Sequence, residues 1–158
     1  MLERLRFVRY ALRFERAFRT DAWERVKECF HPDAEYVVAG APPFDGTTRG
    51  PDAIVRLFQR MLNDFDRRFD ARSPQLASCP RVTDGVLSLR WRVRYSASFG
   101  SVVLAGVSSC RFADGRIIEL RDTMAPEDWT RALALVEAAG PRIARDPPEA
   151  GGPNGDQR

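Results

Sequence analysis

The stretch VLSLRWRVRYSASFGSVVLAGVSSCRFADGRIIELRDTM, residues 86–124, decides the fold. Apolar and polar side chains alternate over residues 87–97, which is the period of a β-strand with one buried face. A second alternating segment follows at 101–112, and the turn signal Ala-Asp-Gly leads from it into a third. Three consecutive strands with short connections predict an antiparallel sheet.

The third of these strands places a carboxylate among apolar side chains. By strand period, Ile118, Leu120, Asp122 and Met124 share one face. A carboxyl group desolvated there has a raised pKa, in the range useful for acid/base chemistry at neutral pH. Leaving it charged and unpaired would cost several kcal/mol, so the protein must either use it or pair it.

Two pairings remain open as alternatives to a catalytic role for Asp122. One is a salt bridge to an arginine, with Arg13 or Arg49 as candidates. The other is a capping role toward the helix that starts near Pro126.

Helical patterns flank the predicted sheet. An apolar stripe including Tyr10 and Phe14 repeats at helical spacing near the N-terminus, and a second one, including Phe58, follows a proline suited to a first helical turn at Pro51. A strand is predicted at 34–38, containing Tyr36, and a last helix at 125–140. Residues 39–50 are rich in Gly, Pro, Asp and Thr and predict a loop that covers the pocket mouth as a lid.

This order of elements predicts one α+β domain over residues 1–140. A cone-shaped, curved antiparallel sheet wraps around N-terminal helices and encloses a central apolar pocket. Residues 141–158 are rich in proline, glycine and charge without apolar periodicity, and are expected to be a disordered tail.

Composition excludes several classes of protein. The 158 residues are 44% hydrophobic and 30% charged with a net charge of +3, and no apolar run is long enough to span a bilayer or to act as a secretory signal. A cytoplasmic protein without membrane association is expected. One histidine, His31, and three cysteines without paired spacing predict neither a metal site nor a cofactor. Nearly all basic residues are arginine, which suits a GC-rich genome better than a nucleic-acid partner.

Three segments resemble the nuclear-transport-factor-2-like superfamily, also called SnoaL-like or a cystatin-like roll: DAWERVKECFHPDAEYVV at 21–38, TTRGPDAIVRLFQRM at 47–61 and CRFADGRIIELRDTM at 110–124. The resemblance covers residues 5–139. It implies a deep apolar pocket, often in a dimer, and a family that contains polyketide cyclases, ketosteroid isomerases, epoxide hydrolases, dehydratases and proteins of no known reaction.

The family's catalytic patterns fit this sequence unequally. The positions of the ketosteroid isomerase groups fall at Phe14, Val38 and Ser108, so all three groups are missing. The pattern of limonene-epoxide-hydrolase-like enzymes matches at Asp122, but the second carboxylate is absent and Arg92 faces outward. SnoaL-type cyclases require only a pocket aspartate as acid/base, which Asp122 provides.

The resulting expectation is a SnoaL-like small-molecule pocket protein: a cofactor-independent isomerase, cyclase or epoxide-hydrolase-type enzyme that acts on a small apolar oxygenated substrate through Asp122. The alternative is a non-catalytic ligand-binding or dimeric assembly module. Two facing acids in the pocket would favour the enzyme, and an arginine-bound Asp122 the module. The expected pocket residues are Phe14, Tyr36, Val38, Phe58, Trp91, Tyr95, Ser108, Cys110, Leu120 and Met124.

A homodimer is expected from two surface features. The outward side of the strand at 87–97 carries an arginine row, Arg90, Arg92 and Arg94. The first helix has an apolar strip, Leu5, Val8 and Leu12, beyond what one buried face requires.

Overall fold

One curved, mixed sheet forms the frame of the protein, whose computed structural model describes residues 2–140. The strand order is β2-β1-β7-β6-β5-β3, with β4 paired to β5. The predicted tail at 141–158 lies outside the described residues. The strands are β1 Phe30–Ala39, β2 Gly46–Arg49, β3 Ala71–Leu76, β4 Arg81–Thr83, β5 Val86–Ala97, β6 Gly100–Ala113 and β7 Arg116–Met124.

The three long C-terminal strands confirm the predicted antiparallel arrangement. β5 pairs with β6 along all of its own length, from Val86 opposite Arg111 to Ala97 opposite Gly100. The turn between β6 and β7 has two central residues, Asp114 and Gly115, at φ 49° and 77°. Positive φ at both positions matches the hairpin turn that follows the right-handed strand twist, which is why the sequence uses Asp-Gly there.

A β-bulge in β7 changes which isoleucine faces the core. Arg111 pairs with Glu119 but Phe112 pairs with Ile117, so Ile118 has no partner on β6. Ile117 is therefore the buried residue, at 1% exposure, and the prediction that Ile118 shares the inner face with Leu120 was wrong. C-terminal to the bulge the alternation is as predicted, and Asp122 points inward.

β1 is longer than the sequence pattern indicates. It begins at Phe30 rather than at Ala34 and includes the His-Pro-Asp segment, where its pairing with β7 shifts register. β1 and β7 run parallel, in contrast to the other pairs of the sheet. The parallel contact places Tyr36 beside Leu120 and Val38 beside Asp122.

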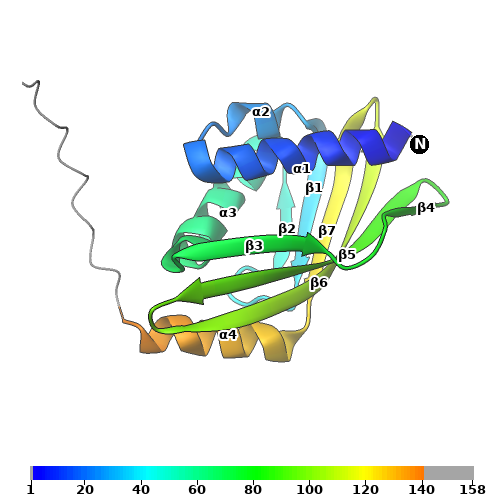
Figure 1. Ribbon diagram of the computed structural model, residues 1–158. Coiled ribbons are helices and arrows are strands. Elements are labelled where there is room, and N and C mark those ends of the chain that lie inside the picture. Colours follow the sequence, from blue (N-terminus) through cyan, green and yellow to red (C-terminus); the bar gives the residue numbers. More distant parts are fainter. Residues whose placement is uncertain (1, 141–158) are drawn as a thin grey trace, which may run out of the picture.

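Helices cover the concave face of the sheet (Figure 1). They are α1 Leu2–Thr20, α2 Glu24–Lys27, α3 Pro51–Asp64 and α4 Pro126–Ala138, with a 3-10 turn, η1, at Asp66–Arg68. Figure 1 shows α1 and α3 on the inner side of the sheet and α4 along its other end. None of the helices in residues 2–140 has the length and apolar character needed to cross a membrane.

Candidate functional site

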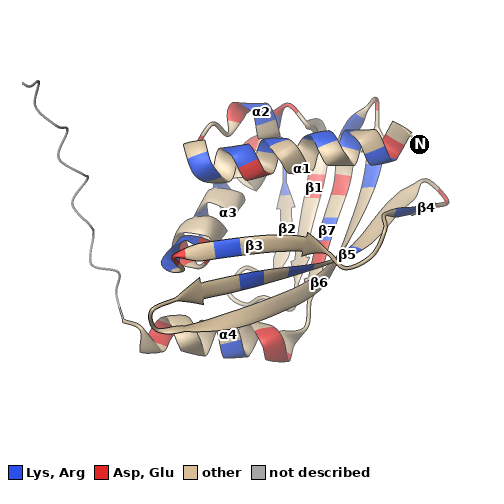
Figure 2. Ribbon diagram, in the orientation of Figure 1, with Lys and Arg blue, Asp and Glu red and all other residues tan. Residues whose placement is uncertain are grey.

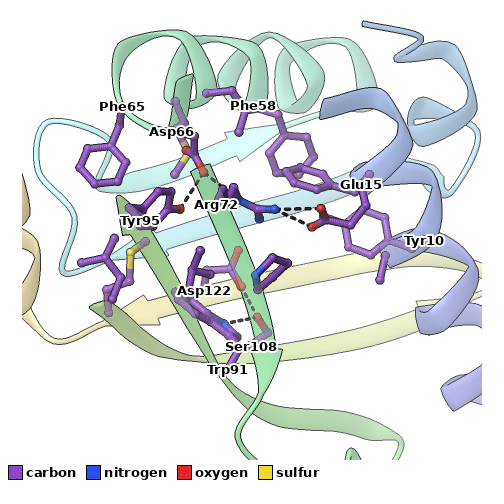
Figure 3. A pocket seen from close by; sticks show the side chains of 18 of the residues that line it. Tyr10, Glu15, Phe58, Phe65, Asp66, Arg72, Trp91, Tyr95, Ser108 and Asp122 are labelled. Atoms are coloured by element: carbon purple, nitrogen blue, oxygen red, sulfur yellow. Dashed lines mark hydrogen bonds and ion pairs between the residues drawn. The ribbon is translucent and has the colours of Figure 1, made fainter. Parts of the chain in front are cut away.

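A cavity of about 240 Å³ lies between the concave sheet face and helices α1, α3 and α4. Its wall is mostly aromatic and aliphatic (Figure 3). The volume is below the roughly 300–1,000 Å³ of pockets for drug-sized ligands, so a ligand enclosed in this space must be smaller than those. Most of the expected residues line it: Phe14, Tyr36, Phe58, Trp91, Tyr95, Ser108, Asp122 and Met124.

Three expected pocket residues do not line this cavity. Val38, Cys110 and Leu120 lie on the inner face of the sheet, but each is only 1–2% exposed and belongs to the hydrophobic core. Strand alternation correctly predicts that these residues lie on the inner face of the sheet. It cannot show which part of that face the helices cover directly. Burial also raises the pKa of the Cys110 thiol, which keeps it protonated.

Asp122 is held by two hydroxyl groups from two neighbouring strands. The Tyr36 hydroxyl on β1 donates to Asp122 Oδ2 at 2.8 Å. The Ser108 hydroxyl on β6 donates to Oδ1 in a short hydrogen bond. Each carboxyl oxygen therefore has one protein donor, and each keeps a further lone-pair position for a ligand.

Burial raises the pKa of Asp122, and the hydrogen bonds from Ser108 and Tyr36 partly oppose that shift because they stabilise the ionised form. Desolvation is the larger of these effects. Burial raises the pKa of Tyr36, and the charge of Asp122 raises it further, so the phenol remains a donor at neutral pH.

The alternative that an arginine pairs with Asp122 is wrong. Arg13 forms its ion pair with Glu28 at 3.3 Å, and Arg49 pairs with Glu35 at 2.7 Å. No cation among residues 2–140 lies within ion-pair distance of Asp122. The capping role is wrong as well, because the N-cap of α4 is Ala125 and no side chain accepts a capping hydrogen bond from the helix N-terminus.

Trp91 sets the direction of the Ser108 hydroxyl. The indole Nε1–H is a donor only, and it donates to Ser108 Oγ at 2.9 Å. Ser108 therefore accepts a hydrogen bond from Trp91 and donates one to Asp122. The ring lies over Gly106, its partner on β6, where a Cβ would overlap the indole. A glycine is required there because any larger residue would displace the tryptophan ring.

A second cluster of charged groups borders the cavity on another side (Figure 3). Arg72 on β3 donates through Nη1 to both oxygens of Glu15 on α1, at 2.9 and 2.8 Å. Its Nε donates to Asp66 Oδ1 at 3.2 Å, and the Tyr95 hydroxyl donates to the same oxygen at 2.7 Å. The cluster joins α1, η1, β3 and β5, which makes it a cross-link around the cavity.

Both acids of this cluster, Glu15 and Asp66, form ion pairs with Arg72. Burial raises the pKa of Asp66, whereas Arg72 and Tyr95 act to lower it. Burial acts to lower the pKa of Arg72, but its neighbours Tyr95, Asp66 and Glu15 outweigh that effect and raise it, so the guanidinium stays charged. The sequence pattern did not identify this cluster. The available signals are Glu15 beside the apolar stripe of the first helix and an aspartate directly after Phe65, at the end of the second apolar helix.

The segment at 39–50 does not act as a lid in this structure. None of residues 39–50 lines the cavity. Phe44 is 5% exposed and packs edge-on against Trp129 of α4, with ring centroids 6.0 Å apart. Trp129 Nε1 donates to the carbonyl oxygen of Pro42 at 2.7 Å. These contacts fix the segment against α4, and its last part forms strand β2 rather than a loop.

The single histidine lies away from the cavity. The His31 ring nitrogens are 3.8 Å from the carboxylates of Asp33 and Asp114, both of which are largely exposed. Within residues 2–140, no group of three His, Cys, Asp or Glu side chains is arranged to hold a metal ion.

Comparison with known proteins agrees with this architecture. Residues 11–120 match the SnoaL-like domain family, and the chain therefore belongs to that family. No curated protein matches the chain.

Solved structures with this fold share little sequence with the chain. A nuclear-transport-factor-2-like protein of unknown function from Burkholderia pseudomallei is 18% identical, with 84% of this chain and 97% of that one covered and a TM-score of 0.66. A provisionally named isomerase from Rhodopseudomonas palustris is 14% identical, with coverages of 82% and 96% and a TM-score of 0.67. TerC, co-crystallised with polyporic acid, is 16% identical, with coverages of 80% and 97% and a TM-score of 0.63.

Proposed function

We propose that this protein is a cofactor-independent acid/base enzyme, with Asp122 as the group that moves the proton. One observation carries the proposal. Asp122 lines an apolar cavity, is held by two neutral hydroxyl groups, and has no cation within ion-pair distance among residues 2–140. A buried carboxyl group without a structural partner of opposite charge is typical of general acid/base catalysts.

The contacts of Asp122 suit a group that takes up and returns a proton. Its raised pKa makes the ionised form a stronger base than an exposed aspartate. Tyr36 and Ser108 fix the plane of the carboxyl group without neutralising it. The free lone-pair position on either oxygen can then accept a proton from a ligand in the cavity.

Isomerisation or cyclisation is supported better than epoxide hydrolysis. Those reactions need one carboxyl group that moves a proton within the same ligand. Epoxide opening by paired carboxylates needs a second free acid, and the other acids at the cavity, Asp66 and Glu15, are bound to Arg72. The fold neighbours support a small organic substrate, since one is provisionally named an isomerase and another was crystallised with polyporic acid.

The proposal can be tested without the natural substrate. The probe 5-nitrobenzisoxazole loses its ring C–H proton to a base while its N–O bond breaks, which releases a coloured phenolate. We expect saturable acceleration by the wild-type protein and a loss of about a hundredfold in Asp122→Asn. The matched control Asp33→Asn removes a carboxylate that is 87% exposed, and it should leave the rate unchanged.

Each outcome of this experiment has a definite meaning. If Asp122→Asn keeps the wild-type rate, Asp122 is not the acid/base. If the wild-type protein binds the probe but does not accelerate its reaction, the alternative of a non-catalytic ligand-binding module replaces the enzyme.

A further inference from the structure

The ion pair between Arg72 and Asp66 leaves part of its hydrogen-bonding capacity unused. A guanidinium group can donate two parallel hydrogen bonds to the two oxygens of one carboxylate. Here only Nε donates, to Asp66 Oδ1, and that oxygen also accepts from the Tyr95 hydroxyl. No other residue within 2–140 hydrogen-bonds to Arg72 Nη2 or to Asp66 Oδ2. The backbone amide of Asp66 acts on its own carboxyl group, but a carboxylate oxygen accepts more than one hydrogen bond.

The two unused groups belong to the wall of the cavity. Arg72 and Asp66 line the same space as Asp122 (Figure 3). Their side chains are only 12% and 13% exposed. Every fully enclosed polar side-chain atom within residues 2–140 has a hydrogen-bond partner, so an unpartnered Arg72 Nη2 must keep accessible surface. A ligand in the cavity can therefore reach a donor and an acceptor that the protein does not use.

The cluster holds these groups in fixed positions. Arg72 Nη1 bonds to both oxygens of Glu15, and the guanidinium lies 5.0 Å from the centre of the Phe18 ring. Asp66 is held by Arg72 and by the Tyr95 hydroxyl at 2.7 Å. A donor and an acceptor that are fixed before the ligand arrives bind it with little loss of conformational entropy.

The chemistry of the two groups selects the ligand. A hydroxyl group fits both of them, because its oxygen accepts one hydrogen bond while its O–H donates another. A carbonyl oxygen accepts only, so it would leave the Asp66 acceptor without a partner. A carboxylate would lie beside Asp66 and Glu15, and the repulsion from these two acids opposes its binding to the one arginine.

We propose that Arg72 and Asp66 form a subsite for a hydroxyl group of the substrate, which accepts from Arg72 Nη2 and donates to Asp66 Oδ2. The substrate class that this implies is a small, mostly apolar phenol or alcohol. Its reacting C–H bond lies away from the hydroxyl group, at Asp122. The place of the reacting carbon rests on the function proposed above, whereas the binding of the hydroxyl group does not. Arg72 and Asp66 act in specificity and take no part in the proton transfer.

A matched pair of probes measures this subsite. In p-xylene a methyl group replaces the hydroxyl group of 4-methylphenol, and the two molecules have nearly the same shape. An apolar cavity without partners for the hydroxyl would favour p-xylene, because the phenol loses its hydrogen bonds to water on entry. We expect the wild-type protein to bind 4-methylphenol about fivefold more tightly than p-xylene, measured by calorimetry.

Asp66→Asn tests the acceptor half of the subsite. Arg72 Nε and the Tyr95 hydroxyl both require an acceptor, so the amide oxygen should face them and the amide nitrogen should face the cavity. The ligand hydroxyl then has no acceptor for its proton. We expect the preference for 4-methylphenol to disappear while the affinity for p-xylene changes less than about twofold. Retained binding of p-xylene shows that the cavity is intact.

Arg72→Lys tests the donor half if Asp66→Asn does not fold. Lysine keeps a cation for Glu15 and Asp66 but has one nitrogen in place of three, so the preference for the phenol should again be lost. Asp33→Asn removes an exposed carboxylate and should keep the wild-type ratio of the two affinities.

The outcomes separate this inference from the proposed function. A wild-type protein that does not prefer 4-methylphenol overturns the subsite, and so does an unchanged ratio in folded Asp66→Asn or Arg72→Lys. Asp122→Asn should keep the ratio, because hydroxyl binding needs no proton transfer. A ratio lost in Asp122→Asn and kept in Asp66→Asn would place the hydroxyl at Asp122 and overturn the inference. None of these binding results changes the benzisoxazole test of Asp122.

Discussion

The phenol of Tyr36 donates a 2.8 Å hydrogen bond to the carboxyl group of Asp122, from the strand that runs parallel to β7. The Tyr36 ring is 2% exposed and packs against Phe58 with centroids 5.0 Å apart, so the core fixes the hydroxyl before any ligand binds. Ser108 and Trp91 restrain the other oxygen. The carboxyl group is thus held in place by the fold, as a positioned acid/base requires.

Asp122→Asn is expected to stabilise the domain. The substitution removes a charge that burial disfavours, and the amide can still bond to Tyr36 and Ser108, whose hydroxyls both donate and accept. We expect the free energy of unfolding at neutral pH to rise by about 1–2 kcal/mol, measured by chemical denaturation. A loss of stability would show that the ionised carboxylate is a structural element.

Asp122→Leu provides the contrast to that substitution. Leucine fills the position but leaves the hydroxyls of Tyr36 and Ser108 without their acceptor. We expect this change to lower the free energy of unfolding by about 1–3 kcal/mol. Equal effects of the Asn and Leu substitutions on stability would mean that the hydrogen bonds from Tyr36 and Ser108 do not contribute to it.

The stability difference between wild type and Asp122→Asn should depend on pH. The folded-state pKa of Asp122 is raised above its ordinary value of 3.8, so the folded protein holds this proton at pH values where the unfolded chain has lost it. The carboxyl group therefore favours folding most at acid pH, and that contribution is lost as the pH rises through the raised pKa. The advantage of Asn should be near zero below pH 3.8 and grow above it. Denaturation curves across this range measure the stability difference directly. A difference that becomes smaller as the pH rises would contradict a raised pKa for Asp122.

Gly106→Ala should disturb the site through Trp91. The added methyl group would overlap the indole ring and lie 2.8 Å from the carbonyl oxygen of Thr123, so the ring must move. The indole then loses its hydrogen bond to Ser108. We expect the free energy of unfolding to fall by about 1–3 kcal/mol, measured by chemical denaturation. Trp91→Phe is the matched control, because it removes the N–H donor while keeping an aromatic ring over Gly106.

The sequence predicted the face of Asp122 because strand alternation continues undisturbed from Leu120 to Met124. It could not predict the bulge at Ile118, which depends on the register between two strands, nor which inward residues the helices cover. Val38 and Leu120 are core for that reason. The hydroxyl partners of Asp122 come from strands 14 and 86 residues away, so no local pattern reports that they meet.

The charged cluster was missed for a similar reason. Arg72 and Glu15 are 57 residues apart, and each alone is an ordinary surface residue by type. Only the curvature of the sheet, which places β3 opposite α1, brings them together (Figure 1).

The dimer remains a prediction from the surface. Leu5, Val8 and Leu12 are 62%, 49% and 67% exposed on the outer side of α1, among the basic residues that Figure 2 shows along this helix. Burying such a strip between two copies would remove apolar area from water. We expect a species of twice 17.9 kDa by light scattering at tens of micromolar, and a monomer after Leu5→Gln with Leu12→Gln. A monomer for the wild-type protein at that concentration would contradict the prediction.

Arg72→Met should destabilise the domain more than any of the other single substitutions. It leaves Asp66, whose side chain is 13% exposed, without its cation, while the Glu15 side chain is 38% exposed and can take up water. Removing one partner of a buried ion pair costs about 3–5 kcal/mol of stability. Because Glu15 can be hydrated, we expect a value at the lower end of that range. Loss of the arginine removes an effect that lowers the pKa of Asp66, so that pKa should rise further. The destabilisation should then be larger at neutral pH than at pH 4, where Asp66 takes up a proton.

The double variant Asp66→Asn with Arg72→Met tests whether the cost comes from the stranded charge. Asparagine still accepts the hydrogen bond from Tyr95 and carries no charge. We expect the double variant to recover at least about 1 kcal/mol relative to Arg72→Met alone, measured by denaturation as a double-mutant cycle. Additive losses would mean that Arg72 contributes through packing against the Phe18 ring, 5.0 Å away, rather than through its charge.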